Sequence, residues 1–342
     1  MNRLPQRTPR RRLATVDRRA RRRRAANHRD DLPPGGELGT LIGHWTDAVG
    51  RTGCTVVLAP RGAVGGVAVR GGAPCTRETE IFKLMRGVDP RLVHGVVLGG
   101  GSVFGLAACD GVVRWLSERG VGLQTGHACI PIVAAAGLYD LASGDPRAWP
   151  DAAAGAAACG AARGSGAADG AVGAGTGATV GKAAGAERAT RGGIGIARRA
   201  VGALRAEAIV AVNAFGEVIN PSTGAIVAGV RALNGRGFEP TAALLAGAGS
   251  THFGNTTIGV VVTDAALTRE EAAELACGAH DGLARTIRPV HTRVDGDTLF
   301  VLATGDPAGA GVSMLDMIAL QHAASEAVAA AVLRAVSSTP RR

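Results

Sequence analysis

The chain has 342 residues, of which 46% are apolar, only 3% are aromatic and 52 are glycines. This balance predicts a compact protein with an aliphatic core, in one large domain or two small ones. The absence of any run of eighteen apolar residues excludes a membrane-spanning helix.

Residues 1–31 carry most of the formal net charge of +10, with twelve arginines against three aspartates. This arm has no apolar periodicity and is predicted to be disordered up to about residue 34. It either binds nucleic acid, forms a solvated extension, or precedes the start codon that the cell uses. Because no binding module accompanies the arginines, we expect no nucleic-acid partner.

No apolar stretch follows the arginines, so an export signal is not expected. The six cysteines are scattered, without a CxxC pair or a small-domain disulfide spacing. Reduced thiols in a cytoplasmic protein are the simplest interpretation.

Folded structure is expected to begin after the Pro-Pro-Gly-Gly sequence at residues 33–36. Apolar runs predict buried strands in the first two thirds of the chain, at residues 54–58, 66–70, 92–98, 130–136 and 208–212. A helix is predicted from residue 103 to about 119, on an apolar stripe of helical spacing. The strand at 208–212 should end at Asn213.

Residues 239–255 are expected to form a loop with a short helix, which leads into a β-branched strand at 256–263. Thr268 and Glu271 form a predicted capping box for a helix that runs to about residue 285. A strand at 298–303 and a helix at 312–336 follow. Strands and helices alternate without a strict βαβ period, which predicts a layered α/β fold.

Two glycine-rich segments resemble nucleotide-binding loops but do not fit them. GAGTGATVGK, at residues 173–182, lacks the glycine spacing and the hydroxyl of a P-loop, and GGGSVFG, at 99–105, lacks the third glycine of a dinucleotide motif. The histidines at 44, 94, 127 and 291 form no metal-ligand pattern and are interpreted as structural. We therefore predict no metal and no organic cofactor.

The junction at Asn255 and Thr256 carries the candidate chemistry. A loop containing glycine runs directly into a buried strand, so a cut there would leave a rigidly held N-terminal threonine. The α-amine of such a residue, with an ordinary pKa of about 7.7–8.0, can accept the proton of its own hydroxyl. The motif alone is weak evidence, because two β-branched residues also commonly open a strand.

Seven motifs, spread from residue 43 to 305, resemble the self-processing amidohydrolases of the DmpA aminopeptidase and NylC nylon-oligomer hydrolase type. They are GHWTD (43–47), GCTVVL (53–58), GGSVFGLAA (100–108), GTGATVGK (175–182), VNAFGEV (212–218), NTTIGVVVTDA (255–265) and DGDTLFVLATG (295–305). The resemblance covers residues 38 to 336 and implies a four-layer α/β/β/α sandwich of the N-terminal-nucleophile type.

The resemblance implies that Thr256 is the nucleophile and that Asn255–Thr256 is the self-cleaved bond. It further implies two acidic residues, Asp295 and Asp297, which as alternate residues before a strand would point to one side. Their interpretation from residues alone stays divided between a proton-handling pair and a simple turn. Three further matching positions supply an oxyanion donor, a positive charge and a tyrosine: Asn213, Lys182 and Tyr139.

Thr and Asp/Asp in place of Ser and Ser/Glu resemble the NylC-like branch more than the aminopeptidases. The implied product is an α-chain of residues 1–255 and a β-chain of residues 256–342 in one domain, associated as homo-oligomers. Peptide N-termini, β-amino-acid amides, pantetheine-like amides and ω-amino-acid oligomers remain open as substrates. The alternative is an unprocessed, catalytically silent protein that acts in binding or as a scaffold.

Overall fold

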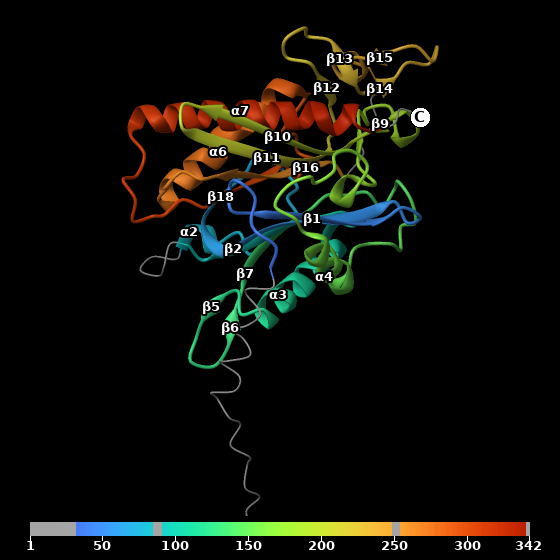
Figure 1. Ribbon diagram of the computed structural model, residues 1–342. Coiled ribbons are helices and arrows are strands. Elements are labelled where there is room, and N and C mark those ends of the chain that lie inside the picture. Colours follow the sequence, from blue (N-terminus) through green and yellow to red (C-terminus); the bar gives the residue numbers. More distant parts are fainter. Residues whose placement is uncertain (1–31, 85–90, 248–253, 340–342) are drawn as a thin grey trace, which may run out of the picture.

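The computed structural model describes residues 32–84, 91–247 and 254–339 (Figure 1). The predicted arm therefore lies outside the described residues, apart from its last positions. Nine strands are joined by hydrogen bonds, eight along one path and β1 beside it, so that two sheets share a long strand, β2 (Thr52–Val69). The two strands predicted at 54–58 and 66–70 are thus one strand. The prediction was wrong there because nothing in the local pattern separates a bend at Gly62, with φ of 79°, from a turn.

The first half of β2 belongs to one sheet and its second half to the other. Residues 52–58 pair with β1 and β4, whereas residues 64–69 pair with β18. The first sheet has the order β1 (Leu41–Asp47), β2, β4 (Val93–Gly99), β7 (Ile132–Gly137) and β3 (Thr76–Arg77). The second has the order β10 (Gly193–Val201), β11 (Leu204–Asn213), β16 (Thr256–Thr263), β18 (Thr298–Ala303) and β2.

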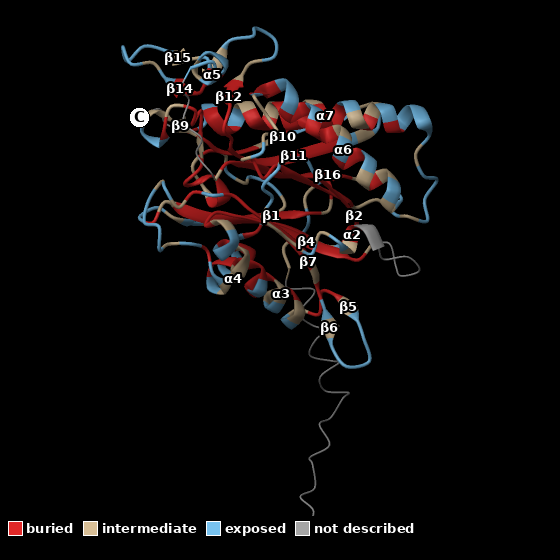
Figure 2. Cartoon of the chain, turned by 180° about the vertical axis from the view of Figure 1, so that it is seen from behind, coloured by how far each residue is buried: buried red, intermediate tan, exposed pale blue. Residues whose placement is uncertain are grey.

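Helices cover the outer face of each sheet. α3 (Ala108–Glu118) and α4 (Ala152–Ala161) pack on the first sheet, and α6 (Arg269–Thr286) and α7 (Met314–Ser337) pack on the second (Figure 1). Between the sheets lies a third apolar cluster with members from both, including Val96, Ile209 and Phe300. Figure 2 shows these facing surfaces as buried. The predicted four-layer α/β/β/α sandwich is confirmed.

Shorter elements connect these layers or flank them, as follows. They are α2 (Ile81–Leu84), η1 (Ser102–Ala107), β5 (Leu123–Gln124), β6 (Cys129–Ile130), η2 (Gly173–Gly175), β8 (Thr179–Val180), η3 (Ala186–Arg188), β9 (Thr190–Arg191), β12 (Glu217–Ile219), β13 (Ile226–Ala228), β14 (Val230–Arg231), β15 (Phe238–Glu239), α5 (Thr241–Leu245) and β17 (Ile287–Arg288).

Most predicted elements are confirmed within a residue or two. The Thr268–Glu271 capping box opens α6, and β11 ends at Asn213 as expected. The helix predicted from 103 begins instead as the 3₁₀ helix η1, and the strand predicted over 130–136 is divided by Pro131, which has no N–H to donate. Within the described residues, no helix is long and apolar enough to cross a bilayer.

Candidate active site

Strand direction brings three distant segments to one edge of the second sheet. β16 and β18 are parallel neighbours, so both start at this edge, while antiparallel β11 ends there. Thr256, the first residue of β16, lies opposite Asn213, the last residue of β11. Asn255 pairs with Asp295 just ahead of β18. The loop-to-strand junction and the Asp-Gly-Asp motif therefore meet because of topology.

Asn255 and Thr256 are both buried, with 1% and 4% of their surface exposed. The Thr256 hydroxyl donates a hydrogen bond to the carbonyl oxygen of Asn255. The same oxygen accepts the backbone N–H of Gly296 at 2.9 Å. A side chain at Gly296 would crowd the Thr256 hydroxyl, because an added Cβ would lie 2.8 Å from Oγ1. A glycine here lets the backbone approach both the Asn255 carbonyl oxygen and the Thr256 hydroxyl.

The side-chain amide of Asn213 has a fixed orientation. Its oxygen accepts from the Lys182 ammonium at 2.8 Å and from the Thr179 N–H at 3.0 Å. Its nitrogen is thereby turned the other way and donates to the carbonyl oxygens of Tyr139, at 2.9 Å, and Gly254, at 3.3 Å. The donor side of the amide therefore faces the segment that enters Thr256.

Lys182 is buried, with 6% of its surface exposed, and its segment pairs with the turn after β11. Its ammonium donates to the backbone oxygen of Asn213 at 3.0 Å and to that of Gly254 at 3.4 Å. Burial lowers the pKa of Lys182 to about 7, although the charges of Asp295 and Asp140 act in the opposite direction. Lys182 therefore changes its charge near neutral pH.

Tyr139 reaches this edge from the other sheet, two residues after the end of β7. Its ring lies against Gly254, where an added Cβ would come within 2.4 Å of the ring carbon Cδ1. Gly254 also has a φ of 103°, a conformation that side chains disfavour. Packing and backbone together require glycine at this position.

Asp295 and Asp297 are each 1% exposed and are held by different partners. Asp295 accepts from the Phe215 N–H at 3.2 Å and from the Thr292 hydroxyl, and Asp297 accepts from the Thr257 N–H at 2.7 Å. Burial and the neighbouring Asp297 raise the pKa of Asp295 to about 6. In the described residues the Thr256 hydroxyl donates to the Asn255 oxygen and not to either carboxylate.

Three residues that the sequence did not single out for this site belong to it. His291 donates its N–H to Asp297 at 3.0 Å, and its Nδ1 lies 2.8 Å from the same oxygen. Asp140 accepts the Gly101 N–H at 2.7 Å, and burial raises its pKa to about 6. Gly296 is the third. The sequence could have pointed to two of them: Asp140 is next to Tyr139, and Gly296 lies inside the DGD motif.

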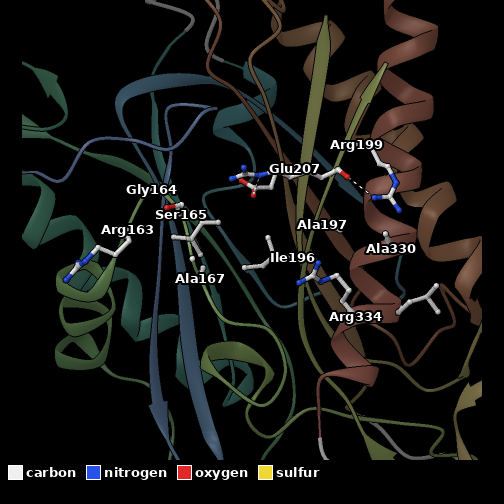
Figure 3. A pocket seen from close by; sticks show the side chains of 14 residues that line it. Arg163, Gly164, Ser165, Ala167, Ile196, Ala197, Arg199, Glu207, Ala330 and Arg334 are labelled. Atoms are coloured by element: carbon white, nitrogen blue, oxygen red, sulfur yellow. Dashed lines mark hydrogen bonds and ion pairs between the residues drawn. The ribbon is translucent and has the colours of Figure 1, made fainter. Parts of the chain in front are cut away.

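A cavity of about 330 Å³ opens beside the site and is lined by Lys182, Tyr139 and Gly254 among others. A larger cavity, of about 630 Å³, lies away from it, between β10, α7 and the loop at residues 163–167 (Figure 3). There Arg198 pairs with Glu207 and Arg334 with Asp169. Among the described residues no cluster of histidine, cysteine and acidic side chains fits a metal ion.

Solved structures share this fold. An L-aminopeptidase D-Ala-esterase/amidase from Ochrobactrum anthropi, described as a variant of the Ntn hydrolase fold, superposes with a TM-score of 0.67 at 21% identity, covering 89% of this chain and 86% of its own. A Burkholderia sp. beta-aminopeptidase gives 0.64 at 23% identity, covering 90% and 89%. The four layers are therefore those of an N-terminal-nucleophile hydrolase fold.

Residues 38–341 match the model of Peptidase family S58, and the chain belongs to that family. An uncharacterized aminopeptidase of Mycobacterium tuberculosis (strain CDC 1551 / Oshkosh) is 42% identical over 83% of this chain and 85% of its own length. A 6-aminohexanoate-oligomer endohydrolase of Kocuria sp. (strain KY2) is 33% identical over 88% and 84%. The predicted family is confirmed, and the chain is a hydrolase of peptide or amide bonds.

Proposed function

We propose that the chain is made as a precursor that cuts itself between Asn255 and Thr256, and that Thr256 then hydrolyses amide substrates. The observation that carries this proposal is the hydrogen bond from the Thr256 hydroxyl to the carbonyl oxygen of Asn255. The nucleophile and the carbonyl group it would attack are in contact before any reaction. A merely structural threonine at a strand start has no need of this contact.

In the self-cleavage step, the Thr256 oxygen attacks the carbonyl carbon of Asn255. The bond from that carbon to the Thr256 nitrogen breaks, and the hydroxyl proton moves to the departing nitrogen. Water then hydrolyses the resulting ester, which gives a carboxylate on Asn255 and frees the hydroxyl and amine of Thr256. The Gly296 N–H, which already donates to the Asn255 oxygen at 2.9 Å, is suited to stabilise the negative charge that develops there.

In turnover, the free amine of Thr256 accepts the hydroxyl proton, and the oxygen forms an acyl-enzyme that water releases. Asn213 and Lys182 supply a neutral donor and a positive charge beside the Gly254 carbonyl oxygen, two residues before Thr256. Asp295 and Asp297 orient the new amine, because they flank the position where it forms. Tyr139 packs on the acyl side.

The two pieces are expected to stay together as αβ units. The β-chain would contribute β16 and β18, which lie between β11 and β2 in the second sheet. Its removal would expose the apolar clusters on both sides of that sheet. Assembly of such units into homo-oligomers, in the cytoplasm, stays a prediction.

N-terminal sequencing of the purified protein tests the proposal. A fragment that starts Thr-Thr-Ile-Gly is expected, with two bands on a denaturing gel. A hydrolysis screen over peptide N-termini, β-amino-acid amides, pantetheine-like amides and ω-amino-acid oligomers then defines the substrate. A single full-length band after long incubation, without turnover of any amide, would instead identify a silent binding or scaffold protein.

A further inference from the structure

Two adjacent residues each hold one of the two aspartates of the site. The His291 N–H donates to Oδ2 of Asp297 at 3.0 Å, and the ring Nδ1 lies 2.8 Å from the same oxygen. In the same arrangement, the N–H and the hydroxyl of Thr292 both donate to Oδ2 of Asp295, the N–H at 3.2 Å. One oxygen of each carboxylate is therefore held by both the backbone and the side chain of a single residue.

The other oxygen of each carboxylate is held at the sheet edge. Oδ1 of Asp297 accepts the Thr257 N–H at 2.7 Å, and Oδ1 of Asp295 accepts the Phe215 N–H at 3.2 Å. The Thr257 N–H belongs to the peptide unit that directly follows Thr256, so Asp297 lies beside the residue whose amine a cut would free. With both oxygens held, the Asp297 carboxylate cannot rotate without losing a hydrogen bond.

The His291 ring directs its hydrogen bonding to Asp297. Its Nε2 is buried and has no hydrogen-bond partner among the described residues. The ring packs edge-on against the ring of His280, with 4.9 Å between the centroids. His280 is fully buried and is held by a hydrogen bond of 3.0 Å between its Nε2 and the Ala68 oxygen. A fixed neighbour thus keeps the His291 ring in place, and the polar contact that the ring makes is the one with Asp297.

The backbone of His291 would also suit a residue without a side chain. Its φ of 54° lies in the left-handed region, which glycine adopts freely and which Asn, Asp and His adopt more often than other side chains do. A glycine would keep the backbone donor to Asp297, because that N–H does not depend on the side chain. The turn therefore does not require the ring, which adds a second donor to Asp297 and the packing on His280.

We propose that His291 is a positioning residue, which fixes the Asp297 carboxylate for the amine of Thr256. The proposal rests on the function proposed above and adds a residue to its machinery. The ring donates from Nδ1, because Oδ2 of Asp297 already accepts the backbone N–H of the same residue. His291 is not among the residues that line the cavity beside the site, so it acts through Asp297 and not through the substrate. A carboxylate oriented in advance stabilises the new ammonium group without reorganisation during turnover.

Two substitutions separate the ring donor from the backbone donor. His291→Gly suits the backbone and keeps the N–H, but it removes the ring. His291→Asn also tolerates this φ, and its side-chain nitrogen can take the place of Nδ1. The p-nitroanilides of L-alanine, β-alanine and 6-aminohexanoic acid are tested, and the one that the wild-type protein hydrolyses fastest is then used for all variants.

We expect His291→Gly to lower kcat by about tenfold or more, the usual effect of losing one hydrogen bond to a charged group, and to leave KM unchanged. His291→Asn should restore most of the lost kcat. An equal loss in both variants would assign the effect to the packing on His280 and overturn the proposal. His127→Asn is the matched control, because His127 is exposed in the turn between β5 and β6. It should keep wild-type kcat and KM, and circular dichroism should show a folded protein in every case.

A double-mutant cycle distinguishes positioning from a structural role. If His291 acts through Asp297, adding His291→Gly to Asp297→Asn should lower kcat by less than about a further twofold, because the carboxylate that the ring positions is already gone. A structural role of the ring would instead lower kcat by the same factor in both backgrounds. Losses that multiply in this way would overturn the proposal.

NMR spectroscopy of protein labelled with ¹⁵N at histidine supplies a readout that needs no turnover. One ring that carries its hydrogen on Nδ1 should be present in the wild type, absent in His291→Asn and shifted in Asp297→Asn. A His291 ring with its hydrogen on Nε2 alone would overturn the proposal. A wild type that hydrolyses none of the three p-nitroanilides would overturn the proposed function and this proposal together. Wild-type turnover with an unchanged kcat in His291→Gly would overturn this proposal alone.

Discussion

Two of the cavities formed by the described residues, one beside the candidate site and one away from it, differ in size and in chemistry. The larger one, of about 630 Å³, is lined by four arginines, of which Arg198 pairs with Glu207 at 2.5 Å and Arg334 pairs with Asp169. The smaller one, of about 330 Å³, is lined by three arginines and Lys182 and opens onto buried, titratable groups. Volume alone would select the wrong cavity. A buried group with a shifted pKa, such as Lys182 in the wall of the smaller cavity, is the better guide to a site.

The largest effect that this comparison predicts concerns Thr256. Thr256→Ala should abolish self-cleavage and turnover completely, because it removes the attacking oxygen from both reactions. Thr256→Ser should retain part of each, since it keeps the oxygen and loses only the methyl group that restricts the side-chain rotamer. Gel analysis, a chromogenic amide and circular dichroism measure processing, turnover and folding.

Thr257→Ala is the control for that variant. Thr257 is buried beside Thr256, and its N–H donates to Asp297. Loss of its hydroxyl should leave processing intact. A folded Thr256→Ala protein that still cuts itself, with an inactive Thr257→Ala protein, would move the nucleophile one residue along the strand.

The acidic pair should have the next largest effect. Asp295→Asn and Asp297→Asn are each expected to slow the chemistry by about 10²–10⁴, the usual cost of losing a positioned proton-handling group. Circular dichroism should show a folded protein in both cases. Wild-type rates in both variants would show that the Asp-Gly-Asp motif serves only as a turn.

The pH dependence of self-cleavage should change by about tenfold per pH unit on each side of a narrow optimum. Burial and Asp297 raise the pKa of Asp295 to about 6, so the rate should rise as pH passes through 6. Burial lowers the pKa of Lys182 to about 7, so the rate should fall above 7 as its charge is lost. Freshly translated protein, which has no free Thr256 amine, gives the cleanest profile, and Asp295→Asn should lose the acid limb. If the acid limb persists in Asp295→Asn, Asp140 is the group responsible for it, because its pKa is also raised to about 6.

The free energy of unfolding should change with pH in the opposite direction to the rate of self-cleavage. The folded Asp295 holds its proton up to about pH 6 and the unfolded one only to about 3.8, so stability falls across that range. The unfolded Lys182 holds its proton up to about 10.5 and the folded one only to about 7, so stability rises from pH 7 upward. For these two groups, the optimum of the reaction lies at the minimum of stability. Denaturant titrations across pH 4–10 measure this.

The smallest effect on activity is expected at the larger cavity. Arg198→Gln leaves the nearly buried carboxylate of Glu207, which is 5% exposed, without its partner. Because Arg198 itself is partly exposed, we expect a loss of only about 1 kcal/mol in unfolding free energy. Processing and turnover should stay at wild-type rates. A drop in kcat/KM would show that the two cavities communicate.

Local sequence patterns predicted the layered fold and most of its elements. β16 and the helix capped by Thr268 were predicted from β-branched composition and a capping box. The long β2 was missed, because the bend that lets one strand serve two sheets depends on the packing of both. Residues 248–253, predicted as part of a loop, lie outside the described residues.

Some residues of the candidate site were likewise predicted from the sequence, and others were not. Motif order brought Thr256, Asn213, Lys182, Tyr139 and the two aspartates to attention, and the structure brings all six to one sheet edge. His291 and the cavity arginines carried no such signal. Arg51, Arg191 and Arg231 are far apart in the chain and meet only through tertiary packing. Because these side chains come together only in the folded structure, the residues next to them in the sequence do not predict their meeting.

The place of β16 inside the second sheet has a consequence for the history of the molecule. A cut ahead of Thr256 would turn one polymer into two, with β16 and β18 of the second inserted between β11 and β2 of the first in a single sheet. Folding before the cut is unimolecular, whereas refolding after it requires two chains to meet at their actual concentration. Neither piece of the mature enzyme would therefore regain the native structure alone. After denaturation, the rate of refolding should rise with protein concentration, as it does for an assembly of two chains.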